Sequence, residues 1–156
     1  MNGAARILVI DDDHEILKTF SAVLRSAGYV VDTAENGRSA IEKCAADFYN
    51  LALIDIRLPD TEGTQLLTAL KETTPKMVKI IVTGYPNLQN AIEAVNKNAD
   101  GYIIKPAQTE ELLEMIREHL RRQQEAKQYS ESKVAEYVET RCRKLQTDEK
   151  QSSTEP

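Results

Sequence analysis

Several features of membrane-bound and secreted proteins are missing from this chain of 156 residues. It has no hydrophobic run long enough to cross a bilayer, and its first residues, MNGAAR, do not form a signal peptide. It has only two cysteines, Cys44 and Cys142, and they do not show the spacing of metal ligands. We therefore expect a cytoplasmic protein without a membrane segment, in which both thiols are reduced.

The chain also lacks an excess of positive charge. Its net charge is −5, with 20 Lys and Arg against 25 Asp and Glu. Residues 121–156 carry eight basic and seven acidic side chains, which leaves twelve basic and eighteen acidic side chains in the rest of the chain. Because a nucleic-acid surface needs a basic patch, we expect neither part to bind DNA or RNA directly.

What the chain does contain is a pattern of short apolar runs that alternate with longer amphipathic stretches. Its composition, 41% hydrophobic and 29% charged, is typical of a globular protein, and its length suits one domain. The pattern predicts strands at residues 6–10, 29–33, 51–55, 78–83 and 101–104, and helices that begin near Asp13, Gly37, Gly63, Asn87 and Gln108. Strands that alternate with helices form parallel sheets, so we expect a doubly wound α/β fold.

The composition changes after residue 120. Residues 121–127 are polar, and a second amphipathic stretch follows, with Val134, Tyr137, Val138 and Leu145 at helical spacing. Residues 148–156 are rich in Ser, Thr, Glu and Lys, a composition typical of disordered chain. We expect residues 122–156 to form a helical extension and a disordered tail. We expect no DNA-binding output domain there, because about thirty-five residues are too few for one.

Polar side chains end the predicted strands at one edge of the sheet. Asp11 and Asp12 follow the first strand, and Asp55 ends the third. Thr83 ends the fourth strand and Lys105 follows the fifth. Open α/β sheets bind ligands at this edge. The acids could hold a hard divalent cation such as Mg²⁺, while Thr83 and Lys105 could contact a phosphoryl group carried on Asp55.

Four segments around these residues resemble the response-regulator receiver domain of two-component signalling. They are residues 7–13 (ILVIDDD), 53–60 (LIDIRLPD), 80–84 (IIVTG) and 99–106 (ADGYIIKP). The resemblance covers residues 5–121. It implies a flavodoxin-like (βα)5 sandwich of three layers, with a five-stranded parallel sheet in the strand order 2-1-3-4-5.

The resemblance also implies a role for each acid. Asp55 would accept a phosphoryl group from a sensor histidine kinase. Asp12 and Asp55 would bind Mg²⁺ directly and Asp11 through a water molecule, with the main-chain carbonyl of Arg57 as a further ligand. We expect Asp13 to cap the first helix instead, because Asp accepts hydrogen bonds from the free N–H groups of a helix N-terminus.

The last two strands receive roles from the same resemblance. Thr83 and Lys105 would hold the phosphoryl oxygens. Tyr102 would be the switch aromatic, which turns inward as Thr83 moves toward the phosphate. We expect the Lys105–Pro106 peptide bond to be cis, an arrangement that proline makes accessible.

Two bulky residues are expected to flank the phosphoryl group. Arg57 lies two residues after Asp55, and Tyr85 lies two residues after Thr83. Because both side chains are large, we expect them to hinder attack by water and to prolong the life of the phosphorylated state.

These features predict a phosphorylation-activated response regulator that catalyses its own phosphotransfer and slow autodephosphorylation, and is not an enzyme with turnover. It would signal through an unidentified downstream protein, bound on the fourth helix, fifth strand and fifth helix near Ala91, Val95, Tyr102 and Leu112. We expect a monomer or a phosphorylation-dependent homodimer, with no direct contact to nucleic acid or membrane.

Two other functions remain open. A phosphohydrolase of the haloacid-dehalogenase type would use Asp11 and Asp13, but His14 stands where that family carries Thr or Val, and Asp55 would have no role. A pseudo-receiver would bind its partners without being phosphorylated. The complete acid set and Lys105 argue against that reading.

Overall fold

The computed structural model describes residues 3–152, and their side chains as far as Thr147. Its sheet has five parallel strands, β1 (Arg6–Ile10), β2 (Val30–Ala34), β3 (Leu51–Asp55), β4 (Val78–Thr83) and β5 (Gly101–Ile104). Their order in the sheet is β2-β1-β3-β4-β5, which confirms the predicted topology.

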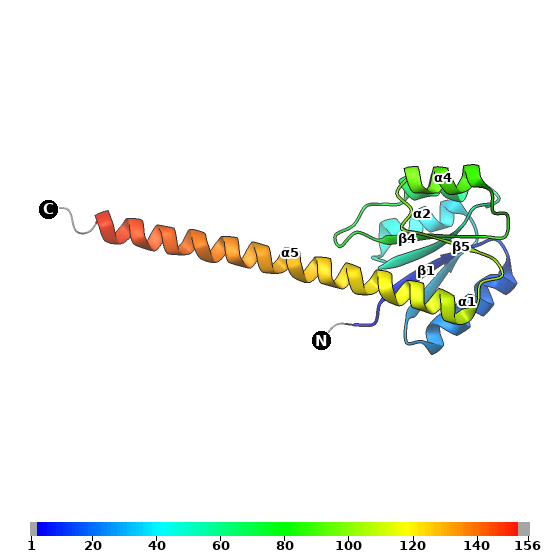
Figure 1. The fold of residues 1–156 in the computed structure, drawn as a ribbon, viewed down its shortest axis with the longest axis horizontal. Coiled ribbons are helices and arrows are strands. Elements are labelled where there is room, and N and C mark those ends of the chain that lie inside the picture. Colours follow the sequence, from blue (N-terminus) through cyan, green and yellow to red (C-terminus); the bar gives the residue numbers. More distant parts are fainter. Residues whose placement is uncertain (1–2, 153–156) are drawn as a thin grey trace. The chain divides into compact units, whose positions relative to one another are not determined.

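Five helices connect and follow the strands: α1 (His14–Ser26), α2 (Gly37–Ala46), α3 (Gly63–Ala69), α4 (Leu88–Asn96) and α5 (Thr109–Ser152). Figure 1 shows α2 and α4 on one side of the sheet, and α1 and the beginning of α5 on the other. The domain therefore has three layers, as the doubly wound fold requires.

The core consists of two apolar clusters, one on each face of the sheet. Successive strand residues point to opposite faces, so Ile7 joins the cluster under α1 and α5 and Leu8 joins the cluster under α2, α3 and α4. All five residues of β3 and all six of β4 are buried. The strands that carry the candidate site are thus held from both faces.

The strand boundaries and the helix starts agree with the predicted ones to within one residue. β2 begins at Val30 and not at Tyr29, and α1 and α4 begin one residue after the predicted starts. Asp13 and Asn87 are the N-cap residues of these two helices, and each accepts a hydrogen bond from a free N–H group through its side chain. The predicted capping role of Asp13 is confirmed.

One surface prediction is wrong. Leu112 was expected on the partner-binding surface, but it is only 2% exposed and belongs to the core cluster under α1 and α5. On α5 it lies one turn before Ile116, which is also fully buried, so this stripe of the helix faces the sheet. Val95 on α4 is exposed as expected.

The helix α5 belongs to two compact units, residues 1–123 and 124–156. In the second unit Val134, Tyr137, Val138 and Leu145 are all exposed. The helix includes residues 148–152, where we expected disordered chain; this segment has neither proline nor glycine and contains good helix formers. Residues 153–156 of the expected tail lie outside the described residues. No helix within residues 3–152 is long and apolar enough to span a membrane.

The first residue of α3 packs directly against the end of β3. A Cβ atom on Gly63 would lie 2.1 Å from the main-chain oxygen of Asp55. The N–H of Gly63 also donates to the main-chain oxygen of Ile56 at 2.6 Å. This close approach fixes the backbone on which Asp55 is carried.

Replacing Gly63 should therefore lower the stability of the domain. We expect Gly63→Ala to reduce the free energy of unfolding by about 3 kcal/mol, because backbone atoms cannot move away from the new methyl group as a side chain could. Urea unfolding followed by circular dichroism measures this loss.

Gly84→Ala is the matched control. A Cβ atom there would meet only the Lys105 side chain, at 3.9 Å. We expect a change below about 1 kcal/mol. Equal losses in the two variants would contradict the role given to the Gly63 contact.

Candidate functional site

The predicted site residues meet at the edge where the parallel strands end. Asp11 directly follows β1, Asp55 is the last residue of β3, Thr83 is the last residue of β4, and Lys105 directly follows β5. A cleft opens at this edge, lined by Asp11, Asp12, Asp13, Ile16, Asp55, Arg57, Gly84, Tyr85 and Lys105. The side chains that the sequence analysis assigned to one edge of the sheet therefore lie at that edge.

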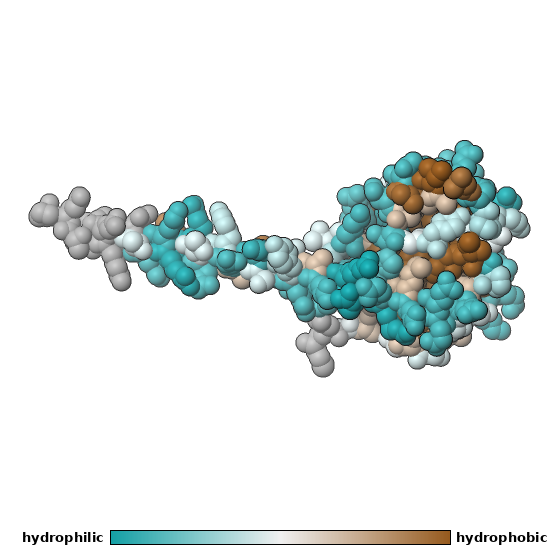
Figure 2. Space-filling view, viewed as in Figure 1, coloured by the Kyte–Doolittle hydropathy of each residue, from teal (hydrophilic) through white to brown (hydrophobic). Residues whose placement is uncertain are grey.

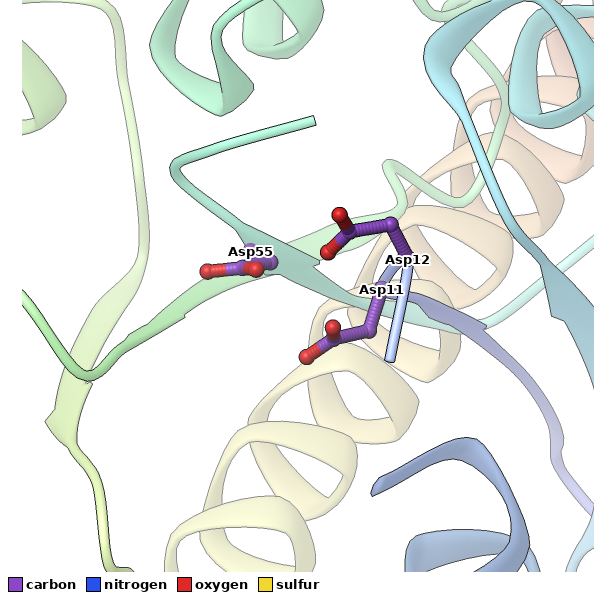
Figure 3. A group of neighbouring side chains, drawn as sticks. All are labelled: Asp11, Asp12 and Asp55. Atoms are coloured by element: carbon purple, nitrogen blue, oxygen red, sulfur yellow. The ribbon is translucent and has the colours of Figure 1, made fainter. Parts of the chain in front are cut away.

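Three carboxyl groups lie side by side in the cleft. Asp11, Asp12 and Asp55 each have a carboxylate oxygen within 4.8 Å of those of the other two. Figure 3 shows their side chains extending from the ends of β1 and β3 into the same space. Asp11 and Asp55 are buried and Asp12 is exposed. Clustered carboxylate oxygens of this kind are the ligands that hard divalent cations prefer.

Lys105 is the cation that contacts these acids in the described part of the chain. Its Nζ atom lies 2.7 Å from Oδ2 of Asp11 but 3.7 Å from Oδ1 of Asp55. Its peptide bond to Pro106 is cis, as predicted, and its N–H donates to the main-chain oxygen of Thr83 at 2.7 Å. The ammonium group thus forms its hydrogen bond with Asp11 and leaves Asp55 less fully compensated.

The pKa of Asp55 reflects this imbalance. Burial, together with the charges of Asp11 and Asp12, raises the pKa of its carboxyl group to about 6, although Lys105 and the N–H of Arg57 act in the opposite direction. Burial disfavours the charged form of a carboxyl group because water no longer solvates it. The site therefore favours the uptake of positive charge, either as a proton or as a cation.

Thr83 and Tyr102 are not among the residues that line this cleft, and they differ in exposure. Thr83 is fully buried, and its Oγ1 accepts a hydrogen bond from the N–H of Tyr85 at 3.0 Å. The ring of Tyr102 is half-buried and packs against the core cluster beneath α2, α3 and α4. Burial also raises the pKa of its phenol. The tyrosine ring is thus turned toward the protein interior.

Arg57 and Tyr85, the two residues expected to flank the phosphoryl group, contact each other. The guanidinium carbon of Arg57 lies 4.1 Å from the centre of the Tyr85 ring, a cation–π geometry. Both residues line the cleft that contains Asp55. This contact joins the loop after β3 to the loop after β4 across one wall of the cleft.

Asp13 and Asp60 both cap helices, but only the role of Asp13 was predicted from the sequence. Asp13 accepts hydrogen bonds from the N–H groups of Glu15 and Ile16, so its carboxylate serves the N-terminus of α1. Asp60 was quoted only as part of a motif. Its carboxylate accepts hydrogen bonds from the N–H groups of Gly37 and Arg38, more than twenty residues away. No local sequence signal marks a cap of this range, because the two partners meet only in the folded sheet.

Comparison with known proteins yields one family. The family model of the response regulator receiver domain matches residues 7–117. The transcriptional regulatory protein ZraR of Klebsiella oxytoca is 37% identical over 106 residues, which cover 68% of this chain and 24% of that protein. The probable transcriptional regulatory protein SilR of Salmonella typhimurium is 31% identical over 131 residues, covering 84% of this chain and 58% of that protein. The chain thus spans about a quarter to just over half the length of these relatives.

Two solved structures support the same family. The CheY-like receiver domain protein of Methanospirillum hungatei JF-1 has a TM-score of 0.76 and 44% identity, and the match covers 80% of this chain and 99% of that one. The response regulator TrrA of Thermotoga maritima, solved in complex with Mg(2+)-BeF, has a TM-score of 0.66 and 30% identity. That match covers 74% of this chain and 98% of TrrA.

The raised pKa of Asp55 predicts an unusual dependence of stability on pH. The folded-state pKa of about 6 lies above the ordinary value of 3.8. The contribution of Asp55 to the stability of the fold is therefore fully present below pH 3.8, where its carboxyl group is protonated, and is lost as the pH rises through 6. With a metal chelator present, Asp55→Asn should therefore be more stable than the unmodified protein at pH 7.5, by about 1 to 3 kcal/mol. The difference should shrink toward pH 4. Urea unfolding at a series of pH values tests this.

Asp32→Asn provides a control of opposite sign. A hydrogen bond from the Tyr49 hydroxyl, helped by Arg6, lowers the pKa of the Asp32 carboxyl. That substitution should destabilise the domain at pH 7.5. If Asp55→Asn were also destabilising at this pH, the electrostatic account of the site would be wrong.

Proposed function

Because the chain belongs to the response regulator receiver family, we propose that it is a phosphorylation-controlled switch in which Asp55 accepts a phosphoryl group from a sensor histidine kinase. One observation carries the proposal. Asp55 lies in the cleft beside two further acids, and Lys105 forms its short contact with Asp11 and not with Asp55. Of the two buried carboxylates, Asp55 therefore interacts more weakly with the ammonium group, so its oxygens are more available to act as a nucleophile.

We propose Mg²⁺ as the cofactor of this reaction. Asp12 and Asp55 would hold it directly, Asp11 would hold it through water, and the main-chain carbonyl of Arg57 would complete the protein ligands. The spacing of the three carboxylates and the upward shift of the Asp55 pKa fit a divalent cation. When bound, the ion would supply positive charge beside the transferring phosphoryl group.

The other residues would act on the phosphoryl oxygens. The Lys105 ammonium group would neutralise part of their charge, and the Thr83 hydroxyl would donate a hydrogen bond. The hydroxyl can do so because it accepts from the Tyr85 N–H through its lone pair and keeps its own proton free for donation. Such a domain catalyses its own phosphorylation and slow dephosphorylation, and turns over no other substrate.

We propose that phosphorylation is communicated through Thr83 and Tyr102 to a surface on α4 and β5. Leu88, Ile92 and Val95 on α4 and Ile104 on β5 are large apolar residues that are more than half exposed. Figure 2 shows a hydrophobic area over α4. Exposed apolar residues gathered in this way favour a protein partner, either an unidentified downstream protein or a second copy of the chain.

The proposal concerns the receiver domain, residues 5–121, and does not carry over the transcriptional role in the names of its relatives. We propose that residues 122–156 are an extension outside this domain. We place the switch in the cytoplasm. Both cysteines within the described residues are free thiols, which fits a reducing compartment.

Phosphorylation tests the function directly. With Mg²⁺ and acetyl phosphate, the chain should gain one acyl phosphate, measured by intact-mass spectrometry. Asp55→Asn should gain none, because the nucleophile is missing. Asp13→Asn should still be phosphorylated in full, because Asp13 caps α1.

Two results would point elsewhere. Repeated turnover of acetyl phosphate that survives Asp55→Ala but not Asp13→Asn would favour the phosphohydrolase reading. A chain that neither gains phosphate nor binds beryllofluoride with Mg²⁺ would be a pseudo-receiver.

The contact between Arg57 and Tyr85 predicts a slow loss of the phosphoryl group. We expect the acyl phosphate to last for minutes or longer without a phosphatase, because the stacked side chains restrict the approach of water. Arg57→Ala and Tyr85→Ala should each shorten this lifetime by about three- to tenfold, and the double variant by less than the product, since the two residues act through one contact.

The lifetime can be followed by the disappearance of the phosphorylated mass after the donor is removed. Arg38→Ala, which removes an exposed arginine from α2, should leave the lifetime unchanged. A lifetime of only seconds in the unmodified chain would contradict the prediction.

A further inference from the structure

The loop between β3 and α3, residues 56–62, is closed at its base. The N–H of Gly63 donates to the main-chain oxygen of Ile56, and Arg57 and Glu62 form an isolated antiparallel bridge. The N–H of Leu58 donates to the main-chain oxygen of Thr61 at 3.2 Å. These contacts shape the loop as a narrow hairpin, and the Thr61 hydroxyl at its tip also donates to Oε1 of Gln65 in α3.

The tip of this loop is held by α2. Oδ1 of Asp60 accepts a hydrogen bond from the N–H of Gly37 at 2.8 Å, and Oδ2 accepts one from the N–H of Arg38 at 3.0 Å. These two N–H groups lower the pKa of the Asp60 carboxyl, so it is charged at neutral pH. A carboxylate at a helix N-terminus also interacts favourably with the helix dipole.

A second contact joins the same two segments. A Cβ atom on Gly37 would lie 2.4 Å from Cγ2 of Thr61, so the loop tip packs directly on the first turn of α2. The helix meanwhile has its own local cap, since Oδ1 of Asn36 accepts from the N–H of Ser39. The Asp60 contact therefore joins the loop to the helix in addition to capping it.

We propose that Asp60 is a positioning residue for the metal and phosphoryl site, acting through the loop that carries Arg57. The inference rests on the proposed function, in which the main-chain carbonyl of Arg57 is a metal ligand. That carbonyl belongs to a loop that is held at its base by the Gly63 hydrogen bond and at its tip by the hydrogen bonds of Asp60 to α2. Arg57 lies between the end of β3 and Asp60. Releasing the tip frees the loop to rotate about its base, which misplaces the carbonyl and loosens the contact of Arg57 with Tyr85.

The test compares Asp60→Ala with two matched controls. Asn36→Ala removes the local cap of the same helix and leaves the loop tether in place. Glu62→Gln removes a negative charge from the same loop, at a residue whose side chain makes no capping hydrogen bond to α3. The first control reports the loss of helix stability alone, and the second reports the loss of charge alone.

Mg²⁺ affinity is measured by following the backbone amide signals of residues 11, 12 and 55 by NMR during titration with the metal alone. We expect Asp60→Ala to weaken Mg²⁺ binding about tenfold, in the range seen when groups that orient metal ligands are removed. Both controls should stay within about twofold of the unmodified chain. Amide hydrogen exchange should accelerate at Gly37 and Arg38 in Asp60→Ala, but at Ser39 in Asn36→Ala.

Three outcomes would overturn the inference. The first is an unchanged Mg²⁺ affinity in Asp60→Ala. The second is a loss of affinity in Asn36→Ala as large as that in Asp60→Ala, and the third is an equally large loss in Glu62→Gln. The second would show that Asp60 only stabilises α2, and the third that only its charge matters. The proposed function would fail differently. In that case the unmodified chain would neither bind Mg²⁺ at these residues nor take up phosphate on Asp55.

Discussion

The crowding of three carboxylates around one lysine is the constraint on which this site depends. Asp11, Asp12 and Asp55 lie within 4.8 Å of one another, and the Lys105 ammonium group compensates chiefly Asp11. Burial and the neighbouring charge of Asp11 make the ionised form of Asp55 unfavourable in the folded protein and raise its pKa to about 6. The rest of the domain has to hold these groups together against their repulsion, and the buried strands β1, β3 and β4 do so from both faces.

The backbone around Asp55 is fixed by contacts that leave no room for adjustment. Gly63 brings the start of α3 against the main-chain oxygen of Asp55, and Gly37 brings the start of α2 against the loop tip. At both places a single methyl group would collide with neighbouring atoms. The start of α3 is therefore positioned by close packing against the backbone at the end of β3, while the start of α2 packs on the side chains of Thr61 and Asp60.

Much of this could be predicted from the sequence because it depends on local patterns. Apolar runs predicted all five strands, and the polar residues at their ends were correctly expected to lie at one edge of the sheet. Contacts between distant segments, such as Asp60 with α2 or Arg57 with Tyr85, could not be predicted from local patterns. Leu112 was misplaced because a leucine near a helix start can face either way until its neighbours are known. Lys79 is another case: it is buried within β4, where its ammonium group donates to the main-chain oxygen of Leu67 in α3.

The position of Lys105 suggests how charge at Asp55 would reach the rest of the domain. In the unphosphorylated chain its ammonium group is bound to Asp11, while its backbone N–H is bound to Thr83. A phosphoryl group on Asp55 would add negative charge beside that ammonium group and compete with Asp11 for it. Because Lys105 directly follows β5, a change of partner at its side chain acts on the strand that carries Tyr102 and Ile104. The lysine thus connects the acids of the cleft to the end of β5 and, through its backbone N–H, to Thr83 at the end of β4.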